Sequence, residues 1–380
     1  MKCSYRTLLN AFQRCLGHAL ILDRRLEHKT TLLYGSKKKL SSNCFENKAQ
    51  SRTRSGTSSK SATSKVSSIS NRPENYFDLD HKGSTSAQFI EAAYKSIVHS
   101  DDDIIALNKP VGVSVHGSRS PSQAGSSAVI DSLSELSRRL QTPDLEIGLS
   151  LKSFYSGLIL ICKGSKSKGK LDLALKFAAS QKLQVLSYLV ISVGIPTCPL
   201  GTDLSTYIRR EFLHNREMSV IQEQNNNTAR KSGSMMLASF RVQTLSTNED
   251  LGVSLVEVSI NKDKWESVET ILSHWLSPVL GDNIYSSRAQ YLMGVPFRTS
   301  AHTVPPTQQR LPARLQAALE DYDPGLTETS RSMPLCMHRH KISLSRFPRK
   351  DSVPLILTAP LPLHFVSLLK HLGLNTKYVH

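Results

Sequence analysis

The chain has 380 residues, of which 39% are hydrophobic, and its formal net charge at pH 7 is +17. This composition suits a folded protein with additional polar length, and no stretch reaches the roughly 18 to 20 apolar residues of a membrane span. The six cysteines are scattered without a Cys-x-x-Cys pair, which argues against a zinc site and a disulfide framework.

Most of the positive charge lies near the N-terminus. The first 75 residues hold 15 basic and 4 acidic residues, whereas the remaining 305 hold 33 basic and 27 acidic residues. The net charge therefore does not by itself predict that the folded part binds a polyanion.

The N-terminal segment is basic and amphipathic. The first 22 residues contain Lys2, Arg6 and Arg14 but no acidic residue, and their apolar side chains recur at helical spacing. This pattern is typical of a mitochondrial presequence, although an ordinary surface helix has it too. We predict a targeting segment over residues 1–34 and a location in the mitochondrial matrix. Residues 35–85 are rich in Ser and Lys, so we expect a disordered linker there.

Residues 86–375 have the apolar pattern of one folded domain. Helices are expected at 87–98, 129–140, 171–179, 266–276, 311–320 and 363–372. Strands are expected at 104–107, 158–162, 185–193, 237–245, 253–260 and 341–346. The elements alternate without a βαβ repeat, which predicts an α+β fold with a mixed, largely antiparallel sheet flanked by helices. Polar stretches near 198–233 and 286–333 are expected to be insertions.

Five sequence blocks follow one another in a fixed order. They read DDDIIALNKPVGVSVHG (101–117), SGLIL (156–160), YLVISVG (188–194), PVLGDNIY (278–285), and HRHKISL followed by APLP (338–344 and 359–362). Together they resemble the motifs of the RluA-type RNA pseudouridine synthases. The resemblance covers roughly residues 90–375, and its closest match is to a subfamily that modifies mitochondrial mRNA. It implies the pseudouridine synthase fold, RNA as the partner, and isomerisation of uridine without a metal or an organic cofactor.

The resemblance also assigns positions in the active site. In the family, an aspartate of an HRLD motif does the covalent chemistry, a basic residue pairs with it, and a tyrosine packs on the base. Tyr188 matches the tyrosine. Counting back four residues from Ser156 places Lys152 at the aspartate, and counting back from Gly281 places Lys264 at the basic residue.

A lysine cannot supply a carboxylate, and Lys152 beside Lys264 would place two like charges together and depress their pKa values. We hypothesise that Glu266 or Glu269 pairs with Lys152, in an exchanged ion pair that preserves the fold and not the chemistry. In an alternative arrangement, a shifted loop brings one of the upstream carboxylates, Asp144 or Glu146, to the site in place of the missing acid.

Contacts to RNA are expected from basic residues in the matching loops, in addition to Lys152 and Lys264. These are Lys109, Arg119, Arg288, Arg339 and Lys341. Lys109 also suits a structural role in the turn that it begins.

Three functions remain open at this stage. The first is an active pseudouridine synthase acting on mitochondrial mRNA or rRNA. The second is a catalytically silent RNA-binding or ribosome-assembly factor on the same fold, because Lys152 replaces the acid. The third is an α+β domain of unrelated role, should the order of the blocks be coincidental.

Overall fold

The structure is a computed structural model that describes residues 86–117, 128–142, 144–323 and 333–377. All of them belong to the compact unit Ser70–His380. The predicted targeting segment and most of the predicted linker lie outside the described residues.

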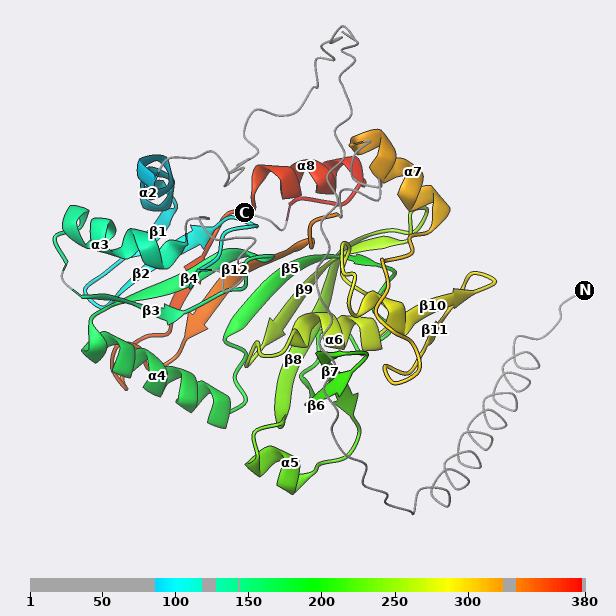
Figure 1. Ribbon diagram of the computed structural model, residues 1–380, viewed down its shortest axis with the longest axis horizontal. Helices are drawn as coiled ribbons and strands as arrows, with labels where there is room; N and C mark the ends of the chain where they lie inside the picture. Colours follow the sequence, from blue (N-terminus) through cyan, green and yellow to red (C-terminus); the bar gives the residue numbers. More distant parts are fainter. Residues whose placement is uncertain (1–85, 118–127, 143, 324–332, 378–380) are drawn as a thin grey trace, which may run out of the picture. The chain divides into compact units, whose positions relative to one another are not determined.

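A large sheet forms the centre of the described fold (Figure 1). Eleven strands of the described residues join in the order β1-β2-β4-β12-β5-β9-β8-β6-β7, with β13 paired to β12 and β3 paired to β4. The strands are β1 (Ile97–Ser100), β2 (Ile104–Lys109), β3 (Leu145–Leu149), β4 (Ser156–Lys163), β5 (Leu186–Val193), β6 (Leu204–Leu213), β7 (Arg216–Gln222), β8 (Met235–Asn248), β9 (Val253–Ile260), β12 (Met337–Leu344) and β13 (Leu355–Thr358). All pairings are antiparallel except β4 with β12, so the sheet is mixed and largely antiparallel as predicted.

Helices flank this sheet, and a separate two-stranded ribbon pairs β10 (Ala289–Leu292) with β11 (Val295–Arg298). The helices are α2 (Ser86–Lys95), α3 (Val129–Arg139), α4 (Ser165–Ser180), α5 (Asn227–Lys231), α6 (Ser267–His274), α7 (Ala313–Tyr322), α8 (Leu363–His371) and the short 3-10 helix η2 (Ser286–Arg288). None of the helices in the described residues combines the length and apolar character that crossing a bilayer requires.

Alternation along β5 separates two apolar cores. Leu189, Ile191 and Val193 pack in one core with residues of α7 and α8, whereas Leu186, Tyr188 and Val190 pack in the other with residues of α4 and α6. Successive side chains of a strand point to opposite faces of a sheet, so this division follows directly from the sequence of β5. The expected site residue Tyr188 therefore lies on the face that α6 covers.

Close approach of β12 to β4 depends on a glycine. Gly157 has a φ of +118°, and a Cβ atom there would lie 2.3 Å from the backbone oxygen of Arg339. Only a residue without a side chain fits this space, and glycine adopts positive φ at little cost. The small residue of the SGLIL block thus lets β12 pair with β4 and brings Arg339 next to the site.

The main departures from the predicted elements lie at edges and insertions. The first helix ends at Lys95, where a helix to 98 was predicted, and β1 follows it. The stretch 198–233, read as a polar insertion, contains the β6–β7 hairpin and α5. Strand β6 lies between β8 and the edge strand β7 and has few buried positions, so its charged residues obscure the alternation that would have predicted a strand.

Candidate functional site

A carboxylate, a guanidinium and a phenol meet where β5, β12 and the segment after β9 come together. Arg339 lies opposite Tyr188 in the pairing of β12 with β5, and Asp263 follows the end of β9. The Arg339 Nε donates to the Tyr188 hydroxyl oxygen at 2.8 Å, and that hydroxyl donates to Asp263 Oδ2. The Arg339 Nη2 lies 3.4 Å from the same carboxylate oxygen. The three side chains therefore form one connected unit.

This unit is buried. The side chains of Arg339 and Asp263 are only 3% and 9% exposed, and Tyr188 is not exposed at all. The Arg339 Nη1 also donates to the carbonyl oxygens of Ser150 and Leu158, at 3.0 and 3.2 Å. Burial raises the pKa of Tyr188 well above its ordinary value, against the opposing effect of Arg339, so the side chain is a neutral phenol at physiological pH.

Lys152 lies in the segment between β3 and β4, nearer to the surface. Its Nζ forms an ion pair with Glu266 Oε1, and the two side chains are 42% and 22% exposed. Glu266, which precedes α6, also accepts a hydrogen bond from the Tyr285 hydroxyl at 3.1 Å. Of the two partners expected for Lys152, the structure places Glu266 in contact. Partial burial lowers the pKa of Lys152, while Glu269 and Asp263 oppose this effect.

Glu269 has a different partner. It lies on α6, whose residues 267–273 are all buried, is 2% exposed, and accepts a hydrogen bond from the Tyr155 hydroxyl at Oε1. Its other oxygen is buried and contacts no donor among the described residues. Burial raises the pKa of Glu269 to about 8, and Asp263 adds to this effect. Glu269 is therefore largely protonated at neutral pH.

Lys109 has a structural position. It is 2% exposed, and its Nζ donates to the carbonyl oxygens of Pro110, Val113, Ser153 and Tyr155 at 2.5 to 3.2 Å. Burial lowers its pKa to about 7, and Arg339 contributes to the lowering. The ammonium group fastens the segment that carries Lys152 to the turn after β2, and it is not presented to an RNA phosphate as expected.

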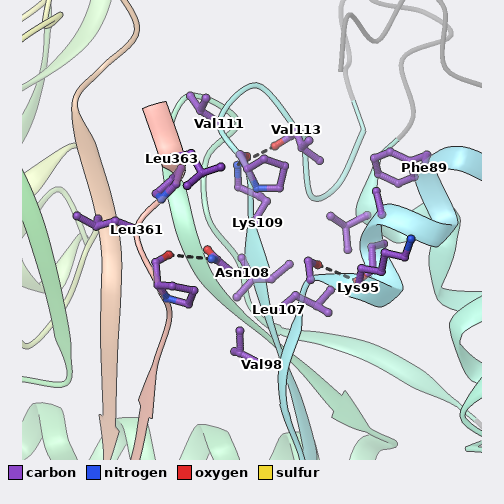
Figure 2. Close-up of a pocket in the computed structure, with 18 of the residues that line it drawn as sticks. Phe89, Lys95, Val98, Leu107, Asn108, Lys109, Val111, Val113, Leu361 and Leu363 are labelled. Atoms are coloured by element: carbon purple, nitrogen blue, oxygen red, sulfur yellow. Dashed lines mark hydrogen bonds between the residues drawn. The ribbon is translucent and has the colours of Figure 1, made fainter. Parts of the chain in front are cut away.

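A cavity of about 510 Å³ lies beside Lys109. Figure 2 shows Lys109 at this cavity, with its hydrogen bond to Val113. The lining is mainly apolar and comes from α2, β2 and the residues that precede α8. Neither Tyr188 nor Lys152 lines it, so this cavity is separate from the site around Tyr188.

The other expected RNA contacts differ in their exposure. Lys264 is exposed, and Lys341 is 38% exposed with its Nζ 3.5 Å from Glu257. Arg288 is 7% exposed, and its guanidinium lies 4.6 Å from the centre of the Tyr285 ring. Arg339 belongs to the buried unit with Tyr188, not to the surface. Arg119 lies outside the described residues.

The sequence reading missed several residues of this region. Asp263 and Tyr155 belong to none of the five sequence blocks. The β6–β7 hairpin brings Arg210 close enough to Lys152 to lower its pKa, and Lys264, the like charge that was expected there, does not contribute. On the same hairpin, Phe212 is 71% exposed. The sequence signal for this surface was the Arg209-Arg210 pair beside an aromatic residue.

Chemically, the site offers three carboxyl groups, two of them ion paired, around a tyrosine and an arginine. Within the described part of the chain, no group of three or more His, Cys, Asp or Glu side chains is arranged to hold a metal ion. Carboxylates can act as nucleophiles or proton acceptors toward a bound substrate, and the paired cations fix their orientation.

Comparisons with known proteins agree with the motifs. The chain is 25% identical to the mitochondrial mRNA pseudouridine synthase RPUSD3 of Bos taurus over 292 residues, which cover 76% of this chain and 80% of the relative. The human protein of the same name is 25% identical over 290 residues, covering 76% and 79%. No protein-family model matches the chain.

Among solved structures, human RNA pseudouridylate synthase domain containing 4 superposes with a TM-score of 0.54. The superposition covers 76% of this chain and 97% of that structure, at 22% sequence identity. The likeness shows that the described domain has the pseudouridine synthase fold, as the sequence predicted.

Proposed function

The chain is related to the RluA-type pseudouridine synthases and shares their fold, and from this premise we propose that it isomerises uridine to pseudouridine in mitochondrial RNA. The reaction replaces the bond from ribose C1′ to uracil N1 by a bond to C5, so substrate and product contain the same atoms. The observation that carries the proposal is that Tyr188 lies against a guanidinium and a carboxylate although residue 152 is a lysine.

RNA binding is supported by the groups at the surface above this site. Lys152, Lys264 and Arg210 carry positive charge there, and Phe212 offers an exposed ring on which an unpaired base can stack. A base must leave its stack to be isomerised, so the enzyme has to hold a flipped nucleotide. If several of these cations contact phosphates, the affinity for RNA falls steeply as salt rises.

The mitochondrial compartment is supported by two observations. The relatives reported above are named as mitochondrial mRNA pseudouridine synthases. The first 34 residues of this chain also have the basic, amphipathic pattern of a presequence. We place the protein in the matrix, with mRNA or rRNA as the substrate.

The test is a map of pseudouridine across mitochondrial RNA from cells with and without the protein. We expect sites that disappear in its absence and return with the wild-type chain but not with Tyr188→Phe, which keeps the packing of the ring and removes its hydroxyl. Tyr291→Phe, on the exposed ribbon, is the matched control and should restore the sites. An identical map with and without the protein would refute the proposal.

A second candidate function is RNA binding without catalysis. Its specific support is the complete burial of Tyr188 and the pairing of Lys152, the residue at the position of the family's aspartate, with Glu266. This function predicts an unchanged pseudouridine map together with crosslinks from the protein to mitochondrial RNA. The same experiment therefore separates the two candidates.

A further inference from the structure

We propose that Asp263 supplies the carboxylate that acts on the uridine, in place of the residue at position 152. The inference rests on the proposed function, because it names the reacting group of that same site. Asp263 lies outside the five sequence blocks, one residue before Lys264.

Geometry distinguishes Asp263 from every other carboxylate nearby. It is bonded to the hydroxyl of Tyr188, the residue that matches the family's base-packing tyrosine, and it is ion paired with Arg339. These two contacts come from adjacent strands, β5 and β12, and both fix the same carboxylate oxygen, Oδ2. A reacting group needs this kind of fixed orientation, because displacement by about 1 Å can reduce a rate 100-fold.

The two glutamates of the site are placed differently. Glu266 is held by Lys152 and by the Tyr285 hydroxyl, and it has no hydrogen bond to Tyr188. Glu269 is directed at Tyr155 beneath α6, and burial raises its pKa to about 8, so it is largely protonated at neutral pH. Neither presents an ionised carboxylate to the ring of Tyr188.

The two upstream acids that could have replaced the aspartate lie elsewhere. Asp144 is exposed and has a φ of +56°, in the turn before β3. Glu146 accepts a hydrogen bond from Ser165 at 2.8 Å and pairs with Lys168 of α4 at 3.2 Å. The structure therefore gives no support to a shifted loop that carries either acid to the site.

The chemical step balances without a co-reactant. A carboxylate oxygen of Asp263 bonds to ribose C1′ as the C1′–N1 bond breaks, and that bond's electron pair remains on uracil. After the uracil turns, C5 bonds to C1′ and displaces the carboxylate, which then accepts the proton from C5. Uracil N1 takes a proton from water, and Asp263 returns its proton to water, so only the position of the glycosidic bond has changed.

Access to Asp263 requires one local change. Burial lowers the pKa of Lys152, and Asp263 is close enough to that lysine to oppose this effect, while the ion pair of Lys152 with Glu266 is partly open to water. Such pairs are weak in solution, and an RNA phosphate can replace Glu266 as the partner of Lys152. In this arrangement Lys152 contributes to RNA binding and to opening the site, whereas the chemistry belongs to Asp263.

The test compares purified full-length variants on mitochondrial RNA labelled with tritium at uridine C5, taken from cells that lack the protein. The measured quantity is tritium released to water, because C5 loses its proton in the reaction. We expect Asp263→Asn to reduce the rate by at least about 1000-fold, as expected for loss of a covalent catalyst. Asp103→Asn is the matched control, because Asp103 is a buried, ion-paired aspartate far from the site; its rate should be that of the wild type.

Folding is checked on the same samples by thermal denaturation. If Asp263→Asn melts well below the wild type, Asp263→Glu replaces it, since glutamate keeps a charge for Arg339 but moves the oxygens by one methylene. We expect that variant to fold and to lose about 100-fold in rate. A folded Asp263→Asn or Asp263→Glu variant with a rate within threefold of the wild type would overturn the inference. So would a loss of activity confined to Glu266→Gln or Glu269→Gln.

Failure of the proposed function gives a different result. In that case the wild-type protein releases no tritium and restores no pseudouridine in cells, and both proposals fall together. Active wild-type protein with an active Asp263→Asn variant refutes only the assignment of the carboxylate.

Discussion

The buried glutamate of α6 makes a specific prediction about stability and pH. Burial raises the pKa of Glu269 from 4.5 to about 8 in the folded protein. Between pH 4.5 and about 8, Glu269 is protonated in the folded protein but ionised in the unfolded chain. The stability that this proton contributes is complete below pH 4.5 and is lost as the pH rises through about 8. Glu269→Gln removes the titration and keeps the shape of the side chain.

The change in the free energy of unfolding depends on how much of the pH range between these two pKa values is crossed. Each pKa unit corresponds to about 1.4 kcal/mol, so ionisation of this group should reduce the free energy of unfolding by about 2 to 3 kcal/mol between pH 5.5 and 7.5. Other groups that titrate in this range are present in both proteins and cancel in the comparison. The Gln variant should therefore gain stability relative to the wild type as the pH rises.

The assay is urea denaturation of both proteins at pH 5.5, 6.5 and 7.5. Glu223→Gln, at an exposed position after β7, is the control and should follow the wild type at every pH. The reasoning would be refuted if wild type and Glu269→Gln lost stability in parallel. That result would mean that Glu269 is already ionised in the folded protein at neutral pH.

Three further predictions concern the contacts around the site. Arg339→Met should lower the free energy of unfolding in urea by about 3 to 5 kcal/mol, because it leaves a buried carboxylate unpaired; a loss below about 1 kcal/mol would contradict the buried ion pair. A double-mutant cycle of Lys152→Ala with Glu266→Ala should give a coupling of about 0.2 to 1 kcal/mol, and no coupling would exclude the pair. Gly157→Ala should cost about 3 kcal/mol or more, because its Cβ would lie 2.3 Å from a backbone oxygen. Gly169→Ala, in open space on α4, should instead raise the melting temperature, and equal effects of the two changes would refute the steric argument.

The elements that the sequence predicted well are those with a single dominant pattern. Strand β9 was predicted at 253–260 and spans Val253–Ile260, and α8 was predicted at 363–372 and spans Leu363–His371. Both have long apolar stretches whose period identifies the element. Strands β3 and β13 were missed because each is short, and few of their side chains are buried.

The site could be predicted only in part, because the contacts that define it are long-range. Tyr188 and its motif were visible, and so was the need for a carboxylate partner for Lys152. Asp263 is 75 residues from Tyr188 along the chain and 76 from Arg339, and only strand pairing brings them together. The spacing of residues within one sequence block does not predict contacts between residues this far apart in the chain.

Electrostatics relates the acidic residues of the segment 262–269 to the cations of the site. A buried charge without a partner is strongly destabilising, so the buried Arg339 requires an acid within reach, whereas the half-exposed Lys152 gains only a weak ion pair. The segment 262–269 supplies Glu266 for Lys152 and Asp263 for Arg339, while Glu269 is held protonated against Tyr155. Arg339 and Lys152 thus each have an anion, and the third acid, Glu269, is neutral.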